Sequence, residues 1–156
     1  VQCIAYTKAD GTGIVAAGGG KVLQVVEGVY ASETSSSSST YADTGLTVNI
    51  TPSNTANKVL VFANIASCGK DTGEIQLALK LLRDSTNISE SLNIGDTGDT
   101  GDNCVGNSTL QKLDSPATTS AITYKVQFKS QGDAARVRIS INNSDCSIVC
   151  MEIDGT

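Results

Sequence analysis

The sequence contains no histidine and no tryptophan, and its only aromatic residues are four tyrosines and two phenylalanines. Histidine is the most frequent general base and transition-metal ligand, so its absence argues against catalysis. A polysaccharide depolymerase would need a pair of carboxylates in a cleft, and the acidic residues show no spacing that indicates one. We therefore expect a protein without enzymatic activity.

Long runs of charge and long apolar runs are also missing. The net charge is -5, without the clustered lysine and arginine residues that nucleic-acid binding requires. No stretch is long and apolar enough to cross a bilayer, and no signal peptide is visible. We expect neither a nucleic-acid partner nor membrane insertion. The chain begins at Val1, so a targeting signal could have been removed upstream.

The five cysteines include no CxxC pair, which argues against a zinc site, and their odd number prevents complete pairing within the chain. Cys146 and Cys150 lie four residues apart in an expected strand. Their Cα atoms would be about 13 Å apart there, too far for a disulfide. Cys68 and Cys104, both near expected loops, form the one pair that we consider. The alternative is that the thiols are free and buried.

What the sequence does contain is strict alternation. In residues 122–129, every second side chain is apolar and the others are polar, which predicts a strand with one buried face. Residues 74–84 fit helix or strand, and the surrounding β pattern favours strand. The serine-rich residues 32–45 are interpreted as an edge strand or loop inside the domain rather than a linker. Further strands are predicted at 21–30, 46–50, 58–67, 136–142 and 146–153.

These segments predict an all-β domain. About eight short strands separated by turns indicate an antiparallel β-sandwich, jelly-roll-like, over residues 21–156. Residues 1–20 form a short expected strand and a glycine-rich joint. We further expect the strands at 122–129, 136–142 and 146–153 to form a meander. The strand at 21–30 has two partly apolar faces, so it could contact another subunit.

Residues 84–109 are predicted to be irregular, and they contain the acidic stretch GDTGDTGDN. The carboxylates of Asp96, Asp99 and Asp102, joined by glycines, could surround a calcium ion with oxygen ligands. Their spacing matches neither the EF-hand loop nor the nonapeptide calcium repeat. The alternative is a solvated acidic loop without metal, and no other cofactor is expected.

Five segments, taken in order, resemble a family of virion structural proteins, including tail-fibre proteins, of marine and cyanobacterial phages. The segments are GGKVLQVVEGVY (19–30), TYADTGLTVNITPSNTANKVLVFANIAS (40–67), LKLLRDSTNI (79–88), LDSPATTSAITYKVQFKS (113–130) and SIVCMEI (147–153). The resemblance implies a compact β-sandwich at the end of a fibre and a homotrimer located in the virion. It brings no catalytic motif, and no receptor-binding residue is transferred from it.

We accordingly expect the fibre or knob domain of a phage tail fibre, which attaches the virion to its host. Multivalent binding to a surface glycan or an outer-membrane receptor would supply avidity. The expected contact loops are residues 67–73 and 84–109. The alternative is a capsid decoration or fibre-building subunit, which would contact other virion proteins and no receptor.

Overall fold

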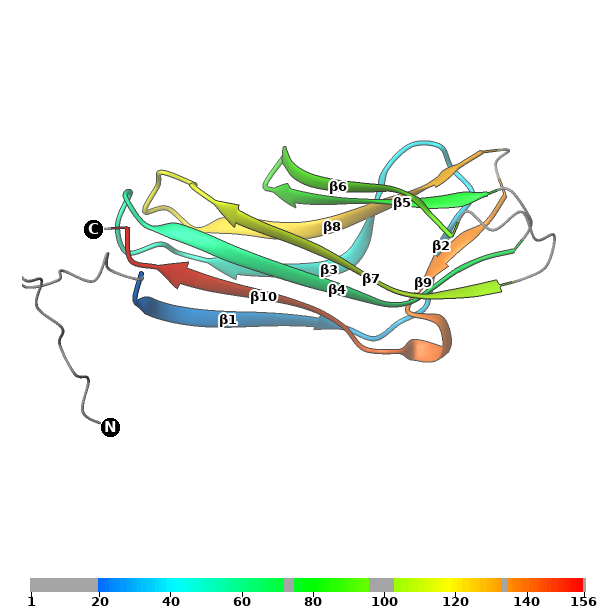
Figure 1. Cartoon of the computed structure of the whole chain (residues 1–156), viewed down its shortest axis with the longest axis horizontal. Coiled ribbons are helices and arrows are strands. Elements are labelled where there is room, and N and C mark those ends of the chain that lie inside the picture. Colours follow the sequence, from blue (N-terminus) through cyan, green and yellow to red (C-terminus); the bar gives the residue numbers. More distant parts are fainter. Residues whose placement is uncertain (1–19, 72–74, 96–102, 133–134, 156) are drawn as a thin grey trace, which may run out of the picture.

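A computed structural model describes residues 20–71, 75–95, 103–132 and 135–155. These residues form ten strands and one short 3-10 turn, η1, between β9 and β10 (Figure 1). The elements are β1 (Val22–Tyr30), β2 (Thr34–Ser36), β3 (Ala42–Ile50), β4 (Lys58–Lys70), β5 (Gln76–Arg83), β6 (Thr86–Ile94), β7 (Asn103–Asp114), β8 (Ile122–Gln131), β9 (Val137–Ile139), η1 (Ile141–Asn143) and β10 (Cys146–Ile153).

The strands form two stacked antiparallel sheets. The first sheet has the order β1-β10-β4, and β7 pairs with β4 on its other side. Past the first residues of β10, the last residues of β4 pair with β9 instead, and β2 pairs with the other side of β9. The second sheet has the order β3-β8-β5-β6. The chain crosses between the six-stranded and the four-stranded sheet after β2, β3, β4, β6, β7 and β8, which is a jelly-roll-like arrangement and confirms the predicted sandwich.

One core fills the space between the sheets. Along β8 the side chains of Ile122, Tyr124, Val126 and Phe128 are buried, and the residues between them are partly exposed, which confirms the predicted alternation. Strand β4 contributes a parallel row of buried residues from the first sheet, and it is central, as its apolar sequence predicts. The ambiguous segment 74–84 is strand β5. Tertiary burial outweighs the helix preference of its leucines and lysine.

The prediction of an irregular region at 84–109 is wrong for its described part. Residues 86–94 form β6, which pairs with β5 through a tight turn at Asp84 and Ser85. Asp84 adopts a left-handed backbone conformation with φ 51°, which aspartate tolerates better than most residues. Strand β6 is the edge of the second sheet and packs mainly Ile88 and Ile94 on the core. An edge strand needs few apolar residues, so the polar sequence of β6 does not show the alternation that predicts a strand.

The predicted meander is also wrong. Strand β8 pairs with β3 and β5 in the second sheet, whereas β9 and β10 belong to the first. The chain crosses between sheets after β8, as jelly-roll connectivity requires. Strand β9 ends at Ile139 because Ser140, Asn142 and Asn143 have positive φ values, so the predicted strand at 136–142 is shorter than expected.

Two boundaries differ from the sequence prediction. Strand β4 continues past Ser67, whose φ of 46° marks an irregular step, as far as Lys70. The serine-rich segment contains the short edge strand β2, which confirms that it lies within the domain. The expected N-terminal strand and most of the glycine-rich joint lie outside the described residues. Among the described residues, no helix has the length and apolarity needed to span a membrane.

Candidate interaction surface

The outer face of the first sheet is apolar and exposed. It carries side chains in register, so that one row across four strands consists of Val25, Met151, Leu60 and Leu113. The exposed fraction is 56% for Val25, 61% for Val29 and 49% for Leu113. We call this surface the apolar face, and define it by Leu23, Val25, Val29, Leu60, Phe62, Leu113, Val149, Met151 and Ile153.

Strand β1 shows why these side chains point to solvent. Its inward positions close the side of the sandwich against β3. A Cβ at Gly28 would lie 2.1 Å from the carbonyl oxygen of Thr47, and the Tyr30 ring covers Gly45. Only glycine permits the first approach, and φ +94° at Gly45 again favours glycine. The inward side chains of β1 pack against β3. The apolar residues at the alternate positions point to solvent, and no described residue packs on them.

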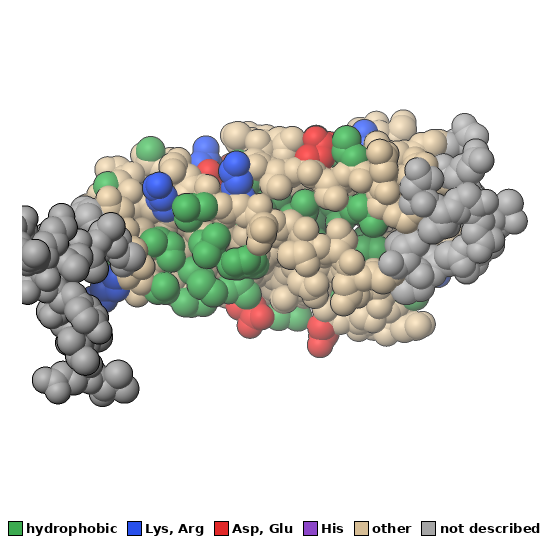
Figure 2. All heavy atoms as spheres, viewed as in Figure 1, with side chains coloured by type: hydrophobic (Ala, Val, Ile, Leu, Met, Phe, Trp, Pro, Cys, Tyr) green, Lys and Arg blue, Asp and Glu red, His purple; other side chains and the backbone are tan. Residues whose placement is uncertain are grey.

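Polar and charged residues border the apolar face. Glu27 is exposed on β1, the strand at one edge of the sheet. On β7, the strand at the other edge, Gln111 is exposed on the same side as Leu113, whereas Lys112 is paired with the buried Val61 and so lies on the opposite side of the sheet. Lys58 is exposed on the side of the apolar face, at the start of β4. In Figure 2, apolar side chains gather over β1, β10 and β4, and charged side chains of both signs lie around them. The surface is an apolar centre with a polar rim, the arrangement of protein–protein interfaces.

The outer face of the second sheet is different, because its polar groups pair with one another. Asp43 accepts hydrogen bonds from Lys125 Nζ at 3.0 Å and from Gln127 Nε2 at 2.7 Å. The hydrogen bond from Gln127 and the neighbouring Lys125 charge outweigh partial burial and lower the pKa of Asp43. A hollow of about 140 Å³ lies beside this pair, smaller than the roughly 300 Å³ at which ligand pockets begin.

A second group on that face surrounds Tyr41. Its hydroxyl donates a hydrogen bond to Glu90, and the ammonium groups of Lys80 and Lys129 lie 3.8 and 4.7 Å from the centre of its ring. Both distances are within the range of cation–π attraction. Partial burial and the Glu90 carboxylate raise the pKa of Tyr41, and the hydrogen bond from Tyr41 lowers that of Glu90. The group is internally satisfied, so it offers few free polar atoms to a partner.

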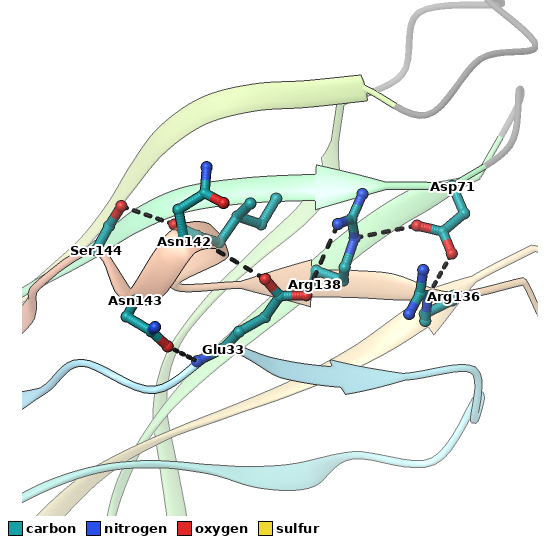
Figure 3. Close-up of polar contacts among 8 residues, drawn as sticks. Glu33, Asp71, Arg136, Arg138, Asn142, Asn143 and Ser144 are labelled. Atoms are coloured by element: carbon teal, nitrogen blue, oxygen red, sulfur yellow. Dashed lines mark hydrogen bonds and ion pairs between the residues drawn. The ribbon is translucent and has the colours of Figure 1, made fainter.

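A third polar group ties together the end of the sandwich where η1 lies (Figure 3). Arg138 stands between two carboxylates, with Nε 3.0 Å from Asp71 Oδ1 and a terminal nitrogen 3.7 Å from Glu33 Oε1. Arg136 forms an ion pair with the same Asp71. The backbone nitrogen of Asn142 donates to Glu33 Oε2 at 3.4 Å. These contacts join the loop before β2, the residue after β4, strand β9 and η1, so their first role is to hold this end together.

Two further polar groups are buried inside the sandwich. Glu152 is fully buried, and its carboxylate accepts hydrogen bonds from Asn57 at 2.6 Å, Gln24 at 2.6 Å and the backbone nitrogen of Ser53 at 2.7 Å. Burial alone would raise the pKa of Glu152, but these hydrogen bonds outweigh it and lower the pKa to about 2. Lys70 is 1% exposed, and its ammonium has no hydrogen-bond partner among the described residues.

A polar link also crosses the core. Asp114, at the end of β7, accepts a hydrogen bond of 2.7 Å from the hydroxyl of the buried Tyr124 on β8. The same carboxylate accepts two hydrogen bonds from Arg83 of β5, at 2.8 and 2.9 Å. Burial and the neighbouring Asp114 carboxylate raise the pKa of Tyr124. The link joins the two sheets, and both donors and the acceptor have their hydrogen-bond partners within it.

The residues predicted as a metal site, Asp96, Asp99 and Asp102, lie outside the described residues. Within the described ranges, no group of three or more aspartate, glutamate or cysteine side chains could hold a metal ion. The expected contact loops are partly wrong, because 67–70 lie in β4 and 86–94 lie in β6. The remainder, apart from Asp71, the β5–β6 turn, Gly95 and the start of β7, is outside the described residues.

The cysteine predictions have different outcomes. Cys146 and Cys150 are buried free thiols on β10, which confirms that they do not bridge. Burial raises the pKa of Cys150 to about 12, so its thiol is unreactive at neutral pH. Cys68 is also buried, with Sγ 3.6 Å from the carbonyl oxygen of Ile65. The side chain of Cys104 is not described, so the Cys68–Cys104 pair stays a prediction.

Sequence reasoning identified β1 as a possible contact strand but missed the rest of the apolar face. The signal was present, because β4 and β10 also carry apolar residues at both alternate positions. A strand of a one-sided sheet would show polar residues at every second position. What the sequence lacked was the order of strands, which places β1, β10, β4 and β7 side by side.

Comparisons with known proteins support the fold. No protein-family profile matches the sequence, and no curated protein sequence is similar to it. The structure resembles that of VP2 from infectious bursal disease virus, solved as a subviral particle, with a TM-score of 0.50 and 12% sequence identity. The match covers 99% of this chain but 38% of the VP2 chain, so this chain spans well under half of that protein. At this identity the likeness shows a shared β-sandwich fold.

Proposed function

We propose that the protein is a structural subunit of a virus particle. The observation that carries the proposal is the apolar face, which is exposed on an otherwise well-packed jelly roll. Large exposed apolar patches on stable domains mark sites of association. A fold shared with a protein that forms a subviral particle, and the ordered resemblance to phage virion proteins, support the same assignment. The proposal places the protein in the virion and assigns it no catalytic step.

The finer form of the proposal is a domain of a phage tail fibre that contributes to host attachment. It is supported by the resemblance and by the exposed, polar end of the sandwich around Asn142 and Asn143, opposite the end that carries Glu152. Weak binding of a glycan or outer-membrane receptor at this end would gain avidity from repeated copies. The homotrimer, and contacts with other virion proteins, stay predictions from the resemblance.

Locating the protein in purified particles tests the proposal. Antibodies against the chain should label intact virions in electron micrographs, and mass spectrometry should find the chain in particles freed of soluble protein. Labelling at the tail supports the fibre form, and labelling over the head supports a capsid decoration. If the chain is present in infected cells but absent from particles, the proposal is wrong.

Attachment needs a separate experiment. The full chain, labelled with a fluorophore, should bind host cells and reduce adsorption of the virus when present in excess. A reducing-end assay on host polysaccharide serves as a control for the absence of catalysis. Virions that contain the chain but whose adsorption is unaffected by it would retain the structural role and remove the attachment role.

A further inference from the structure

Strand β1 leaves one backbone edge of the first sheet open. It pairs with β10 on one side and, among the described residues, with no strand on the other. In an antiparallel pair every second residue directs its N–H and C=O away from its partner, so these groups of β1 point to the free edge. Val26 and Tyr30 face the core from β1 but are only partly buried. A further strand beside β1 would pair the backbone groups and shield these side chains.

The free edge of β1 lacks the features that normally protect an edge strand. Of seven large apolar side chains exposed among the described residues, four lie on β1, namely Val22, Leu23, Val25 and Val29. Glu27 is the only charged residue of β1, the strand contains no proline, and its ladder with β10 is irregular only at the start. Strand β6, the edge of the second sheet, differs, because its sequence is mainly polar and its ladder with β5 is interrupted twice. A long, apolar edge strand is a site at which another strand adds.

A strand-like sequence precedes β1 in the same chain, in residues 1–19, which lie outside the described residues. Residues 1–8 read VQCIAYTK, with Ile4 and Tyr6 two positions apart and smaller apolar residues at the other alternation. Their β-branched and aromatic side chains favour a strand. Apolar residues at both alternations suit a place beside β1, which is itself apolar on both faces. Residues 9–19, ADGTGIVAAGG, contain four glycines and supply a flexible connection.

The connection ends beside the free edge. A Cβ at Gly20 would lie 2.2 Å from Cγ2 of Ile153, the last residue of β10, so the chain enters β1 at one end of the first sheet. Eleven connecting residues span at most about 36–40 Å, whereas the nine residues of β1 are about 30 Å long. Residues 1–8 can therefore reach the whole edge in either direction. The tether gives them a millimolar effective concentration at this edge, which a second copy at micromolar concentration does not match.

We propose that residues 1–8 pair with the free edge of β1 of their own chain, as an added strand of the first sheet. The added strand protects β1 from pairing with another copy. It leaves the apolar face exposed, because it lies beside β1 and not on top of it. The inference goes beyond the proposed function and does not depend on it, since the edge is open whether or not the chain belongs to a virion.

Paramagnetic relaxation by a nitroxide label on Cys3 tests the inference in the full chain. Cys68, Cys146 and Cys150 are buried, and Cys104→Ser removes the remaining thiol, so the label attaches to Cys3 alone. The label should broaden the amide signals of β1 most strongly. It should leave the signals of β6 unchanged, because β6 is the edge of the other sheet. A labelled chain mixed with an unlabelled, isotope-enriched chain reports contacts between copies, and no broadening is expected there.

Proline substitutions show whether the broadening depends on strand pairing. The double variant Ile4→Pro, Ala5→Pro removes two successive N–H donors, one of which points to β1 in either register, so it should abolish the broadening of β1. The matched control Val15→Pro, Ala16→Pro makes the same change in the connection and should keep the broadening. In hydrogen exchange of the unlabelled chain, the first variant should speed exchange of the edge-directed β1 amides at least about tenfold, and the control should not. Circular dichroism should show that both variants are folded, because the described core contains neither pair of positions.

Each other result overturns the inference. Broadening of β1 that is no stronger than that of β6, or that survives Ile4→Pro, Ala5→Pro, would show that residues 1–8 do not pair with the edge. Broadening only in the mixed sample would assign the edge to the N-terminal segment of another copy. Broadening strongest on β4 and β7 would place residues 1–8 over the apolar face.

Discussion

Both outer faces of the sandwich are formed by alternating strands, but only the outer face of the second sheet carries mainly polar side chains. On the second sheet the outward positions of β8 carry Thr123, Lys125, Gln127 and Lys129. Thr123 donates a hydrogen bond to Asn49, Lys125 and Gln127 donate to Asp43, and Lys129 lies over the ring of Tyr41. On the first sheet the outward positions of β1, β4 and β10 are largely apolar. A stable core needs only the inward positions, so the apolar outward residues indicate a requirement other than folding.

The two faces also differ in the contacts that each could make with a partner. Ion pairs and cation–π contacts on the second sheet are already made within the chain, so a partner would have to compete with them. The apolar face makes no such contacts across the four strands, and covering it would release water from Val25, Phe62 and Leu113. The hydrophobic effect would therefore favour covering the apolar face, whereas a partner of the second sheet would have to replace contacts that the chain already makes.

The largest expected effect comes from breaking the polar link that joins the two sheets through the core. Asp114→Ala removes the acceptor of both the buried Tyr124 hydroxyl and the Arg83 guanidinium. Leaving these groups unpaired should lower the free energy of unfolding by about 3–5 kcal/mol. Urea denaturation measures it. Asp43→Ala, which removes an exposed carboxylate of the second sheet, should cost no more than about 1 kcal/mol. Equal effects would contradict the distinction between the core link and the surface pair.

The next effect is a pH dependence that belongs to the first sheet. The folded-state pKa of Glu152 is about 2, below its ordinary value of 4.5, because of the hydrogen bonds to its carboxylate. A lowered pKa stabilises the fold above about pH 4.5, and this contribution is lost as the pH falls toward 2. Glu152→Gln should therefore lower stability by about 2–3 kcal/mol at pH 7, with a smaller difference from the wild type near pH 2. Thermal unfolding at both pH values measures this, and a pH-independent difference would contradict the assignment.

Much of the fold follows from the sequence for a simple reason. A strand such as Ile122–Gln131 covers the core on one side and meets water on the other. Its apolar and polar residues therefore alternate along the sequence, and this alternation predicts the strand. Strand β6 was not predicted, because an edge strand packs few side chains on the core and so shows little apolar alternation. The meander was mistaken because consecutive segments can pair in sequence or cross to the other sheet, and local pattern does not distinguish these.

The interaction surface was harder to predict than the core. Strands β1, β4 and β10 each show apolar residues at both alternations, which is equally consistent with burial on two sides of one molecule and with a contact between molecules. The order of strands decides between these, and it depends on connections that span most of the chain. The distal group of Glu33, Asp71 and Arg138 was unpredictable in the same way, because its members are up to 105 residues apart in sequence.

A buried charge that belongs to neither outer face gives the third prediction. Lys70 lies inside the sandwich, and no described residue accepts a hydrogen bond from its ammonium. Desolvation of an unpartnered charge opposes folding. Lys70→Met, which keeps the length of the side chain, should therefore raise the free energy of unfolding by about 1–2 kcal/mol. Chemical denaturation measures the change, and Lys58→Met at an exposed position should stay within about 0.5 kcal/mol of the wild type. A loss of stability for Lys70→Met would show that its ammonium is satisfied in the folded chain.

The smallest effect tests whether the polar group on the second sheet contributes anything beyond solubility. Tyr41→Phe keeps the ring beneath Lys80 and Lys129 but removes the hydrogen bond to Glu90. Because the group is only partly buried, the free energy of unfolding should fall by no more than about 1 kcal/mol. Titration by NMR should show the pKa of Glu90 rising toward its ordinary value, since the hydroxyl of Tyr41 is the main cause of its lowering. A pKa of Glu90 that stays unchanged in Tyr41→Phe would contradict the role assigned to this hydrogen bond.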